Sequence, residues 1–504
     1  MASIEEIKDI RLKKVEILEK AGIYPYPSKV EKSHTIFEVK ENFKKLEEAA
    51  QSVTIVGRVM SMRGQGALAF VDLYDGTARM QSLLKADENI SYADAKIDLE
   101  KVSIANAFDL FKDTIDQSDF IQVTGTLFVT KRGEETILCK EWKVVAKSLR
   151  PIPDEWYGIK DEDERYRNRY IDILLNEELK NQVIRRSAFW QTIRQFLLTR
   201  DFIEVETPVL ETMPGGADAR PFVTFHNALE MNVYLRISAG ELWQKKLLVS
   251  GIPRTFEIGR IFRNEGMSNE HAQDYTQLEF YMAYSNYDEG MKMVREMFVE
   301  IGDKVFGSTK FEISGSTIDL AEDWNIYDYV ALIEERSNVN VLTADVDELI
   351  GALEDKHIKF DKKEINRERA TDLLWKDIRK TLIAPGFLIN VPMFLEPLAK
   401  ESKIKPGTVE RFQIIMGGTE LGKGFSELND PLDQRRRFEH QEKLRDGGDA
   451  EAQMKDESYI EAMEYGMPPA FGFGLSERVF SVLSGVSIRE AQIFPLMKPK
   501  EVKE

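Results

Sequence analysis

The amino-acid sequence predicts an α+β protein in which a small N-terminal β-barrel is followed by a domain built on an antiparallel sheet flanked by helices. Two observations carry this prediction. Residues 53–147 form five short β-type runs separated by turn residues, a pattern typical of a small barrel. Residues 254–281 then form two alternating strands joined by a long polar loop, and amphipathic helical stretches lie on either side of them.

Length and composition set the expected number of domains. The chain has 504 residues, of which 42% are hydrophobic and 31% charged, so it is a globular chain of about three domains. We expect a helical leader at residues 1–50, the barrel at 51–150 and the larger domain at 151–504. The last should contain a helical, largely structural insertion at about 323–400. Pro151 and Pro153 make a stiff, non-helical join between barrel and large domain.

Charge and cysteine content exclude several classes of protein. The net charge of -18 argues against a general nucleic-acid coat or a DNA-binding protein, although residues 51–150 carry 13 Lys and Arg against 14 Asp and Glu and leave room for a specific RNA reader. No apolar run is long enough to cross a membrane, and the first residues lack a signal-peptide core. The single Cys139 excludes a disulfide framework. We therefore expect a cytoplasmic protein.

The leader is predicted to begin with an amphipathic helix that packs on a neighbouring element. Its apolar residues recur at helical spacing, namely Ile4, Ile7, Ile10, Val15 and Leu18. Ala21-Gly22 ends the helix, and Pro25 and Pro27 prevent it from resuming.

The barrel is predicted to be of the OB type, which commonly binds single-stranded nucleic acid. Five β-runs with a helical stretch at residues 105–112 suit that fold. Such barrels stack bases on aromatic side chains and hydrogen-bond the base edges. Phe70 and Gln81 lie on successive strands, and Phe70 by itself is better explained as a barrel-core residue than as a base-stacking one.

The large domain opens with a long helix and a strand. Residues 178–200 carry a broad apolar helical stripe that includes Phe189 and Trp190, and residues 202–206 form a strand that ends at Thr207-Pro208. The stripe suits a core helix or a subunit interface. A glycine-rich loop at residues 214–222 then contains Gly216, where the backbone can approach a ligand or simply turn. Glu241 follows on a helix, where an acid is usually just solvated.

The hairpin at residues 254–281 carries four polar side chains around its loop. These are Arg263, Glu265, His271 and Tyr275. A guanidinium takes a phosphate and an aromatic ring takes a base, so the group suits a nucleotide. The Arg and Glu alone would be better explained as a surface ion pair.

Two late stretches complete the candidate site. Residues 417–430 offer Glu420 and Glu427 with Phe425 between them; these are either solvated acids or carboxylates for magnesium or a cationic substrate. Residues 470–483, AFGFGLSERVFSVL, form a glycine-rich strand that runs into a helix and presents Arg478.

Together these stretches resemble the class II aminoacyl-tRNA synthetases, and within them the bacterial lysyl-tRNA synthetases. FRNEG with His271 and the strand ending LEFY resembles motif 2, the long helix with its strand and proline resembles motif 1, and AFGFGLSER resembles motif 3; the likeness runs along nearly the whole chain. It implies an ATP-dependent ligase that activates L-lysine to lysyl-adenylate, releases pyrophosphate and transfers lysine to the 3′ end of tRNA(Lys). It also implies an anticodon-binding barrel and a homodimer formed through motif 1.

The resemblance assigns a role to each candidate residue. ATP would be held by Arg263 at the α-phosphate, His271 at the triphosphate, Arg478 at the γ-phosphate, Tyr275 stacked on adenine and Glu265 near the base, with Arg263 and Arg478 as the catalytic pair. Lysine would be held by Gly216, Glu241, Glu279, Tyr281, Phe425 and Glu427. Mg²⁺ would bind Glu420 and, more weakly, Gln413. Phe70 and Gln81 would read the central anticodon uridine.

Three departures from the family pattern leave alternatives open. Gln413 replaces a metal-binding Glu, Lys423 replaces an Asn that touches the amino acid, and Ser476 acts as an extra residue before Arg478. A Lys423 ammonium would either pair with the substrate carboxylate or repel an ammonium. The alternatives to a lysine-tRNA ligase are a catalytically silent tRNA-binding or regulatory paralogue, and a relative that uses another amino acid or a protein target.

Overall fold

A computed structural model of the chain describes residues 3–93, 97–153, 159–217, 219–266, 271–361, 365–446 and 454–500. The chain divides into two compact units, Met1–Lys160 and Asp161–Glu504, so the division falls at Lys160 rather than at the expected Arg150. Residues 267–270 of the predicted hairpin loop and Asp218 of the glycine-rich loop lie outside the described residues. No helix in the described part is long and apolar enough to cross a membrane.

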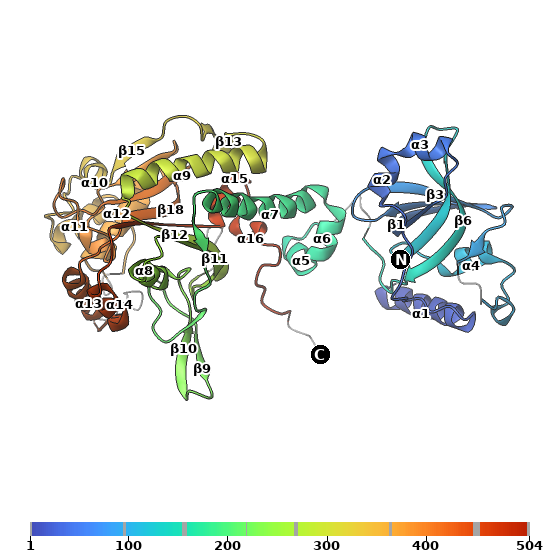
Figure 1. Ribbon diagram of the computed structural model, residues 1–504, viewed down its shortest axis with the longest axis horizontal. Coiled ribbons are helices and arrows are strands. Elements are labelled where there is room, and N and C mark those ends of the chain that lie inside the picture. The colour runs from blue at the N-terminus through green and yellow to red at the C-terminus, as the bar shows by residue number, and fades with distance from the viewer. Residues whose placement is uncertain are drawn as a thin grey trace. The chain divides into compact units, whose positions relative to one another are not determined.

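The first unit contains the expected barrel. Its long strands are β1 (Val53–Gln65), β2 (Leu68–Tyr74), β3 (Arg79–Lys85), β5 (Phe120–Val129) and β6 (Glu135–Ala146), with the short β4 (Ser91–Tyr92) at one edge. They pair in the order β3-β2-β1-β5-β6-β4, and an additional β3–β6 pairing closes the barrel (Figure 1). Five closely paired strands and one inserted helix, α4 (Ala107–Thr114), confirm the OB-type fold.

Strand alternation decides which side chains fill the barrel. On β2, Ala69, Val71 and Leu73 are buried in the apolar core, whereas Phe70 is only partly buried and points to the other face. Phe70 is therefore not a barrel-core residue, which removes the simpler of its two explanations. The core itself centres on Trp142, whose Nε1 donates a hydrogen bond to the Ala107 carbonyl at 3.1 Å.

The leader packs onto the barrel instead of forming a unit of its own. Helix α1 (Ile4–Lys20) begins at a Ser3–Glu6 capping box, and α2 (Ile36–Glu41) and α3 (Phe43–Glu48) follow. Of the five predicted apolar positions only Leu18 is fully buried. Polar contacts fix α1: the buried Arg11 donates to the Gln117 carbonyl at 2.9 Å, and Lys14 pairs with Asp116 at 2.7 Å.

The second unit is built on an eight-stranded sheet in the order β15-β16-β17-β18-β19-β12-β11-β7. Its strands are β7 (Ile203–Glu204), β11 (Arg254–Phe262), β12 (Asp274–Ala283), β15 (Asn325–Asp328), β16 (Gly386–Ile389), β17 (Arg411–Met416), β18 (Thr419–Ser426) and β19 (Ala470–Ser476). The pairs are antiparallel except for β15–β16 and β11–β7. The expected hairpin and the expected glycine-rich strand are thus neighbours, β11-β12-β19, at the centre of the sheet.

The two faces of this sheet have different characters. One face packs against α7 (Glu177–Leu198), α9 (Tyr287–Ile301) and α15 (Arg478–Leu483) through a layer rich in phenylalanine that includes Phe280, Phe471 and Phe473 (Figure 1). The other face is lined by polar residues and is bordered by α8 (Glu241–Val249), α10 (Tyr329–Ser337), α11 (Val346–Asp355) and α12 (Arg367–Arg379). Alternation along β12 sends Leu278 and Phe280 to the first face and Glu279 and Tyr281 to the second, as the sequence predicts.

The insertion at residues 323–400 is not purely helical. It contributes β15 and β16 to the main sheet in addition to its helices, and its segment after β16 borders the polar face. Strands β15 and β16 are only four residues long each. Such short runs give too few alternating positions for a sequence pattern to reveal.

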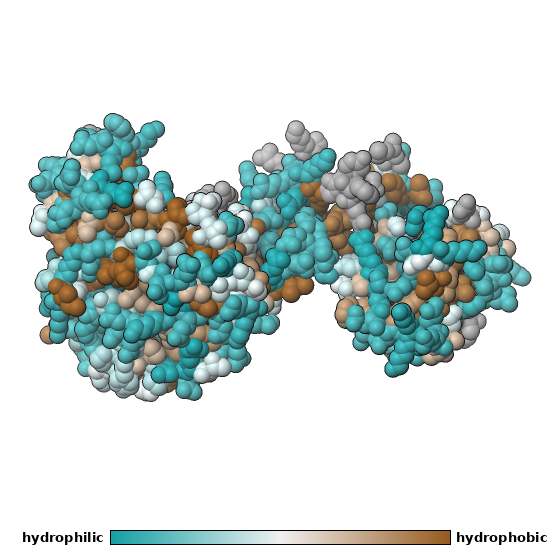
Figure 2. All heavy atoms as spheres, turned by 90° about the horizontal axis from the view of Figure 1, so that it is seen from above, coloured by the Kyte–Doolittle hydropathy of each residue, from teal (hydrophilic) through white to brown (hydrophobic). Residues whose placement is uncertain are grey.

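Smaller elements complete the second unit. A three-stranded sheet joins β8 (Leu210–Glu211), β10 (Met231–Leu235) and β9 (Val223–His226), and β13 (Lys310–Ile313) pairs with β14 (Ser316–Asp319). The remaining helices of the described part are α5 (Glu162–Arg167), α6 (Arg169–Leu175), α13 (Pro431–Asp446), α14 (Glu457–Glu464) and α16 (Ile488–Ala491), with short turns at Glu100–Val102, Gly302–Phe306 and Met393–Leu395. In the view of Figure 2 the surface of this unit is largely hydrophilic, with apolar side chains exposed in places.

Candidate active site

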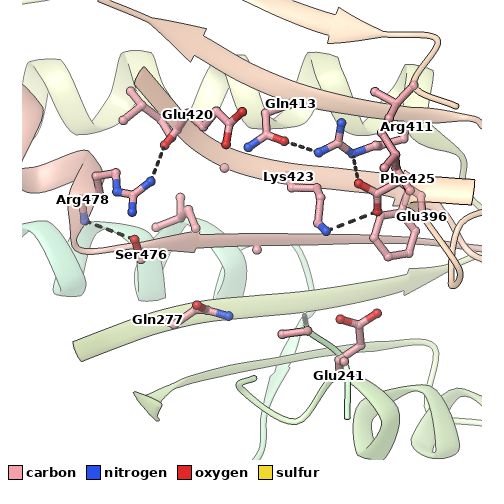
Figure 3. Close-up of a pocket in the computed structure, with 18 of the residues that line it drawn as sticks. Glu241, Gln277, Glu396, Arg411, Gln413, Glu420, Lys423, Phe425, Ser476 and Arg478 are labelled. Atoms are coloured by element: carbon pink, nitrogen blue, oxygen red, sulfur yellow. Dashed lines mark hydrogen bonds and ion pairs between the residues drawn. The ribbon is translucent and has the colours of Figure 1, made fainter. Parts of the chain in front are cut away.

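The polar face of the eight-stranded sheet holds a cavity of about 560 Å³. Strands β12, β17, β18 and β19 form its floor, and α8 and α12 contribute to its walls (Figure 3). Most of the residues singled out in the sequence line it: Gly216, Glu241, Arg263, Glu265, His271, Tyr275, Glu279, Tyr281, Gln413, Glu420, Lys423, Phe425 and Arg478. Segments more than 250 residues apart in the chain therefore meet in one site, because β19 pairs with both β12 and β18.

Two arginines stand in the half of the cavity around the β11–β12 hairpin. Arg263 follows β11, where its backbone N–H donates to the Gln273 carbonyl at 2.8 Å and its guanidinium carbon lies 5.8 Å from the centre of the Tyr275 ring. Arg478 begins α15, and its Nη1 donates to the Glu420 carbonyl at 3.4 Å (Figure 3). Ser476 lies just before it and accepts the Arg478 backbone N–H through Oγ at 3.3 Å. Ser476 thus anchors the start of the helix that presents Arg478.

The other half of the cavity contains a buried cluster of acids. Glu241 is the first residue of α8, Glu279 lies on β12, and Glu427 follows β18; all three are less than a tenth exposed. Glu427 does not line the cavity itself. Its carboxylate lies behind the lining, 2.6 Å from the ammonium of Lys245, which also reaches Glu241 at 2.7 Å. Lys245 is fully buried and bridges two of the three acids.

The acids outnumber this internal ammonium, and their proton affinities reflect it. Burial and the Glu241 charge raise the pKa of Glu279 to about 7. Burial, opposed by Lys245, also raises the pKa of Glu427, to about 8. Burial acts to lower the pKa of Lys245, but the charges of Glu241 and Glu427 overcome it and hold the pKa above the usual value. The ammonium stays charged, and the carboxylates that it cannot neutralise take up protons.

Hydrogen bonds fix the acids and their neighbours in place. The Ala239 backbone N–H donates to Glu279 Oε1 at 2.9 Å, and the Tyr281 hydroxyl donates to Glu279 Oε2 at 3.1 Å. Phe425 and Tyr281 flank the ammonium of Lys245, which lies 5.2 Å and 5.7 Å from their ring centres. The Glu427 Oε1 atom is fully buried and has no hydrogen-bond partner among the described residues. A buried acceptor of this kind favours a cationic ligand, because an unsatisfied charged group is costly.

At two positions beside the acid cluster there is no room for a side chain. A side chain at Gly472 on β19 would place its Cβ 2.1 Å from Glu427 Oε1 and 2.5 Å from the Tyr281 ring. At Gly216 the backbone φ is +85°, and a Cβ would lie 2.6 Å from that of Glu241. Only glycine fits either position, so the predicted role of Gly216 beside the pocket has a steric basis.

The chain turns sharply at Gly240, directly before Glu241. This glycine has a φ of +78°, and a Cβ there would meet Thr207 Oγ1 at 2.2 Å. The left-handed turn starts α8 at the next residue and directs Glu241 into the cavity.

Glu420 offers a limited metal site. Its Oε1 accepts from Trp375 Nε1 at 2.8 Å, and its Oε2 lies 3.4 Å from Arg379, both on α12. Within the described residues no group of three His, Cys, Asp or Glu side chains is close enough to hold a metal ion. The donor set fits a magnesium ion that shares one carboxylate with a bound phosphate, and does not fit an ion held by protein ligands alone.

Two of the three residues that depart from the family pattern lie directly opposite each other. Gln413 on β17 pairs in register with Lys423 on β18. The Lys423 ammonium is 3.3 Å from Glu396 Oε2, and Arg411 Nε is 2.8 Å from Glu396 Oε1. Arg411 also donates to the Gln413 side-chain oxygen (Figure 3). The neutral Gln413 amide is thus occupied as a hydrogen-bond acceptor for Arg411.

The sequence interpretation missed several residues of this site. Lys245 lies four residues after Glu241 on α8, so helical i,i+4 spacing is a signal that could have identified it. Arg411 lies two residues before Gln413 on β17, where strand alternation places both on one face. Glu396 and the α12 residue Arg369 come from the insertion, to which the sequence assigned no chemistry.

Phe70 and Gln81 belong to the barrel unit and not to this cavity. Both side chains are partly buried, and they lie on the antiparallel neighbours β2 and β3. Gln81 Oε1 accepts a hydrogen bond from Thr136 Oγ1 at 3.1 Å, which orients its amide. On β1, Arg63 pairs in register with Phe70. Phe70 and Gln81 therefore lie on neighbouring strands, and neither is fully buried in the barrel core.

Comparison with known proteins covers nearly all of the chain. Residues 161–498 match the family of class II tRNA synthetases (D, K and N), and residues 53–152 match the OB-fold nucleic acid binding domain. The lysine–tRNA ligases of Thermotoga maritima and Carboxydothermus hydrogenoformans are each 38% identical to it over 99% of the chain, and the matches cover 98% and 99% of those proteins. The lysine–tRNA ligase of a Nostoc species is 39% identical over 99% of the chain and 89% of its own length.

Proposed function

The chain belongs to the class II tRNA synthetases, and from this membership we propose that it is the ligase that joins L-lysine to tRNA(Lys) at the expense of ATP. The observation that carries the amino-acid specificity is the charge of the buried cluster. When all three carboxylates are ionised, the single ammonium of Lys245 leaves two negative charges, and lysine brings two ammonium groups to match them. A substrate with an acidic side chain would find here only the Lys245 ammonium, which is fully buried and already paired with Glu241 and Glu427.

Lysine binds with its amines toward the acids. The α-amine meets Glu241 and the backbone of Gly216 at the N-terminal end of α8, and the side-chain amine meets Glu279, Glu427 and the Tyr281 hydroxyl. Phe425 packs along the aliphatic chain. The support for this orientation is that Glu427 Oε1 is buried without a hydrogen-bond partner among the described residues and packs against Gly472, directly behind the lining of the cavity.

ATP occupies the half of the cavity that holds the arginines. Tyr275 stacks on adenine with Glu265 near the base, Arg263 binds the α-phosphate, and His271 and Arg478 bind the outer phosphates. Two anions must meet in this reaction, so fixed positive charge lowers the barrier more than a nucleophilic side chain would. A carboxylate oxygen of lysine attacks the α-phosphorus, pyrophosphate leaves, and lysyl-adenylate forms.

The second half-reaction uses the same site. The terminal 3′-hydroxyl of the tRNA attacks the carbonyl carbon of the adenylate, the ester forms, and AMP leaves. Glu420, and more weakly Gln413, would hold a magnesium ion, which would neutralise charge on the phosphates of ATP. Ion pairing of Glu420 with Arg379 is consistent with a carboxylate that exchanges partners when the nucleotide arrives.

Specific tRNA recognition falls to the barrel, and dimerisation to motif 1. Phe70 stacks on the central anticodon uridine and Gln81 hydrogen-bonds its edge. The segment after α7 exposes large apolar side chains, with exposed fractions of 52% for Ile203, 57% for Val223 and 56% for Phe225. Such exposure supports burial against a second copy of the chain. ATP, lysine and tRNA meet in the cytoplasm, which is where we place the reaction.

The test is amino-acid-dependent exchange of pyrophosphate into ATP, run with all twenty amino acids and without tRNA. We expect a signal confined to lysine. A signal with a different amino acid would refute the assignment of the acid cluster. A folded, dimeric protein without any signal would instead favour the catalytically silent paralogue.

A further inference from the structure

Lys423 is a cation at the centre of the cavity, placed between its two halves. Along β18 the order is Glu420, Lys423 and Phe425; the first faces Arg478 and the last flanks the buried acids (Figure 3). The Lys423 side chain is 44% exposed and lines the cavity. Its ammonium is therefore accessible to a ligand that spans both halves.

The acid beside Lys423 does not neutralise it. Glu396 pairs with Arg411 at 2.8 Å and with Lys423 at the longer distance of 3.3 Å, so one carboxylate faces two cations. Glu396 and Arg411 are each about a tenth exposed or less, whereas Lys423 is much more exposed. Gln413, the register neighbour of Lys423, adds no charge. Glu396, Arg411, Gln413 and Lys423 together carry a net charge of plus one, and Lys423, which lines the cavity, is far more exposed than Glu396 and Arg411.

We propose that Lys423 binds the α-carboxylate of the amino-acid substrate and thereby determines where lysine's carboxylate stands when it meets the nucleotide. This inference rests on the proposed function and deepens it. The substrate amines enter the acid cluster, which fixes the carboxylate on the opposite side of Cα, toward β18. The Glu396–Arg411 pair is the positioning element, because it holds the Lys423 side chain over the floor of the cavity.

The inference separates Lys423 from the phosphate-binding arginines. A cation that binds the carboxylate matters before ATP is present, whereas a phosphate-binding cation matters only with the nucleotide. The comparison of L-lysine with L-lysinamide isolates this contact, since lysinamide keeps both amines and lacks the carboxylate charge. Both amines are protonated at about pH 6.5.

The experiment is isothermal titration of the full-length protein with each ligand at about pH 6.5, in the absence of ATP. The unaltered protein should bind lysine roughly 10- to 100-fold more tightly than lysinamide, the range expected for a charge-assisted hydrogen bond. In Lys423→Ala the lysine affinity should fall to that of lysinamide, while lysinamide binding stays the same. Lys423→Arg should retain most of the preference, and Lys304→Ala, a surface lysine paired with Glu300, should leave it unchanged.

Several outcomes would overturn the inference. A Lys423→Ala protein that keeps the full preference for lysine, or that loses both ligands equally, shows that Lys423 does not bind the carboxylate. Loss of MgATP affinity with the preference intact assigns Lys423 to the phosphates instead. If the unaltered protein binds no lysine, the proposed function fails, and the inference fails with it; if it binds lysine normally, the inference alone is at stake.

A double variant tests the positioning role of Glu396. If Glu396 acts through Lys423, Glu396→Gln should reduce the preference for lysine over lysinamide in the unaltered background and have no effect on it in Lys423→Ala. An equal effect in both backgrounds would refute the positioning role.

Discussion

Binding of lysine should release protons from the enzyme, and the number released should fall as pH rises. In the free enzyme the carboxyl groups of Glu279 and Glu427 have pKa values raised to about 7 and about 8, chiefly by burial. An ammonium placed against them favours their ionised forms and so lowers both pKa values. At a pH below these pKa values the two carboxyl groups are protonated, so lysine binding expels their protons. At a higher pH they are already ionised and have no proton to release.

The magnitude follows from the two pKa values. If both carboxylates are fully ionised in the complex, binding releases about two protons at pH 6, about one and a half at pH 7 and about half a proton at pH 8. The two titrations belong to the cluster as a whole, since Glu241 and Lys245 share it. The decline over this pH range is the quantity to test.

The assay is calorimetry in buffers of different ionisation enthalpy. At each pH, the slope of the observed binding enthalpy against the buffer enthalpy gives the number of protons released. Glu461→Gln, which removes an exposed acid of α14, serves as the control and should not alter the slope. A slope of zero at pH 6 and pH 7 would show that the carboxylates are already ionised in the free enzyme, and would refute the argument from surplus acids.

Three further predictions concern single residues. Arg263→Ala should reduce adenylate formation at least about a hundredfold in pyrophosphate exchange and leave the dimer intact by light scattering, because it removes a fixed charge from the reacting phosphate; an unchanged rate removes Arg263 from that role. Phe70→Ala should weaken tRNA charging by about 1–3 kcal/mol of lost stacking with lysine activation unaffected; an equal fall in activation would make Phe70 a folding residue. Gly472→Ala should raise the KM for lysine and destabilise the protein by about 1–3 kcal/mol in thermal unfolding, because its Cβ would overlap Glu427 and Tyr281, whereas Gly351→Ala, which has open space, should do neither; equal effects of the two changes would contradict this steric argument.

The sequence was most informative where periodicity and residue chemistry agree. The five barrel strands and the alternation on β12 were predictable because a strand with one buried face must alternate. The same rule brought Glu279 and Tyr281 to one side of the sheet. Phe70 was ambiguous because an alternating run does not show whether its odd-numbered or its even-numbered residues face the core. The burial of Ala69 and Val71 shows that the odd-numbered residues of β2 face it.

The rest of the site depends on long-range packing that no local pattern encodes. Glu396 reaches Lys423 because the chain after β16 returns across the face of the sheet, which places residues 27 positions apart side by side. Residue type alone predicts a solvated Lys245, since charged side chains are rarely fully buried. It is buried because Glu241 and Glu427 lie within 3 Å of its ammonium, and Glu427, which follows β18, lies 182 residues further along the chain.

The two faces of the sheet explain how such a charged cluster persists in the interior. Gly472 and Gly474 on β19 have no side chain, so Glu279, Tyr281 and Glu427 can pack against them on the polar face of the sheet. The alternate residues Phe471 and Phe473 point into the apolar layer on the other face. Alternate residues of each strand thus stabilise the apolar layer or face the cavity. Burying three carboxylates near one ammonium is unfavourable by itself. The apolar layer supplies the stability that this arrangement lacks, and lysine relieves the imbalance when it binds. The free energy stored in the surplus carboxylates is therefore a source of selectivity, since a ligand with fewer than two ammonium groups would leave one of them unpaired in the interior.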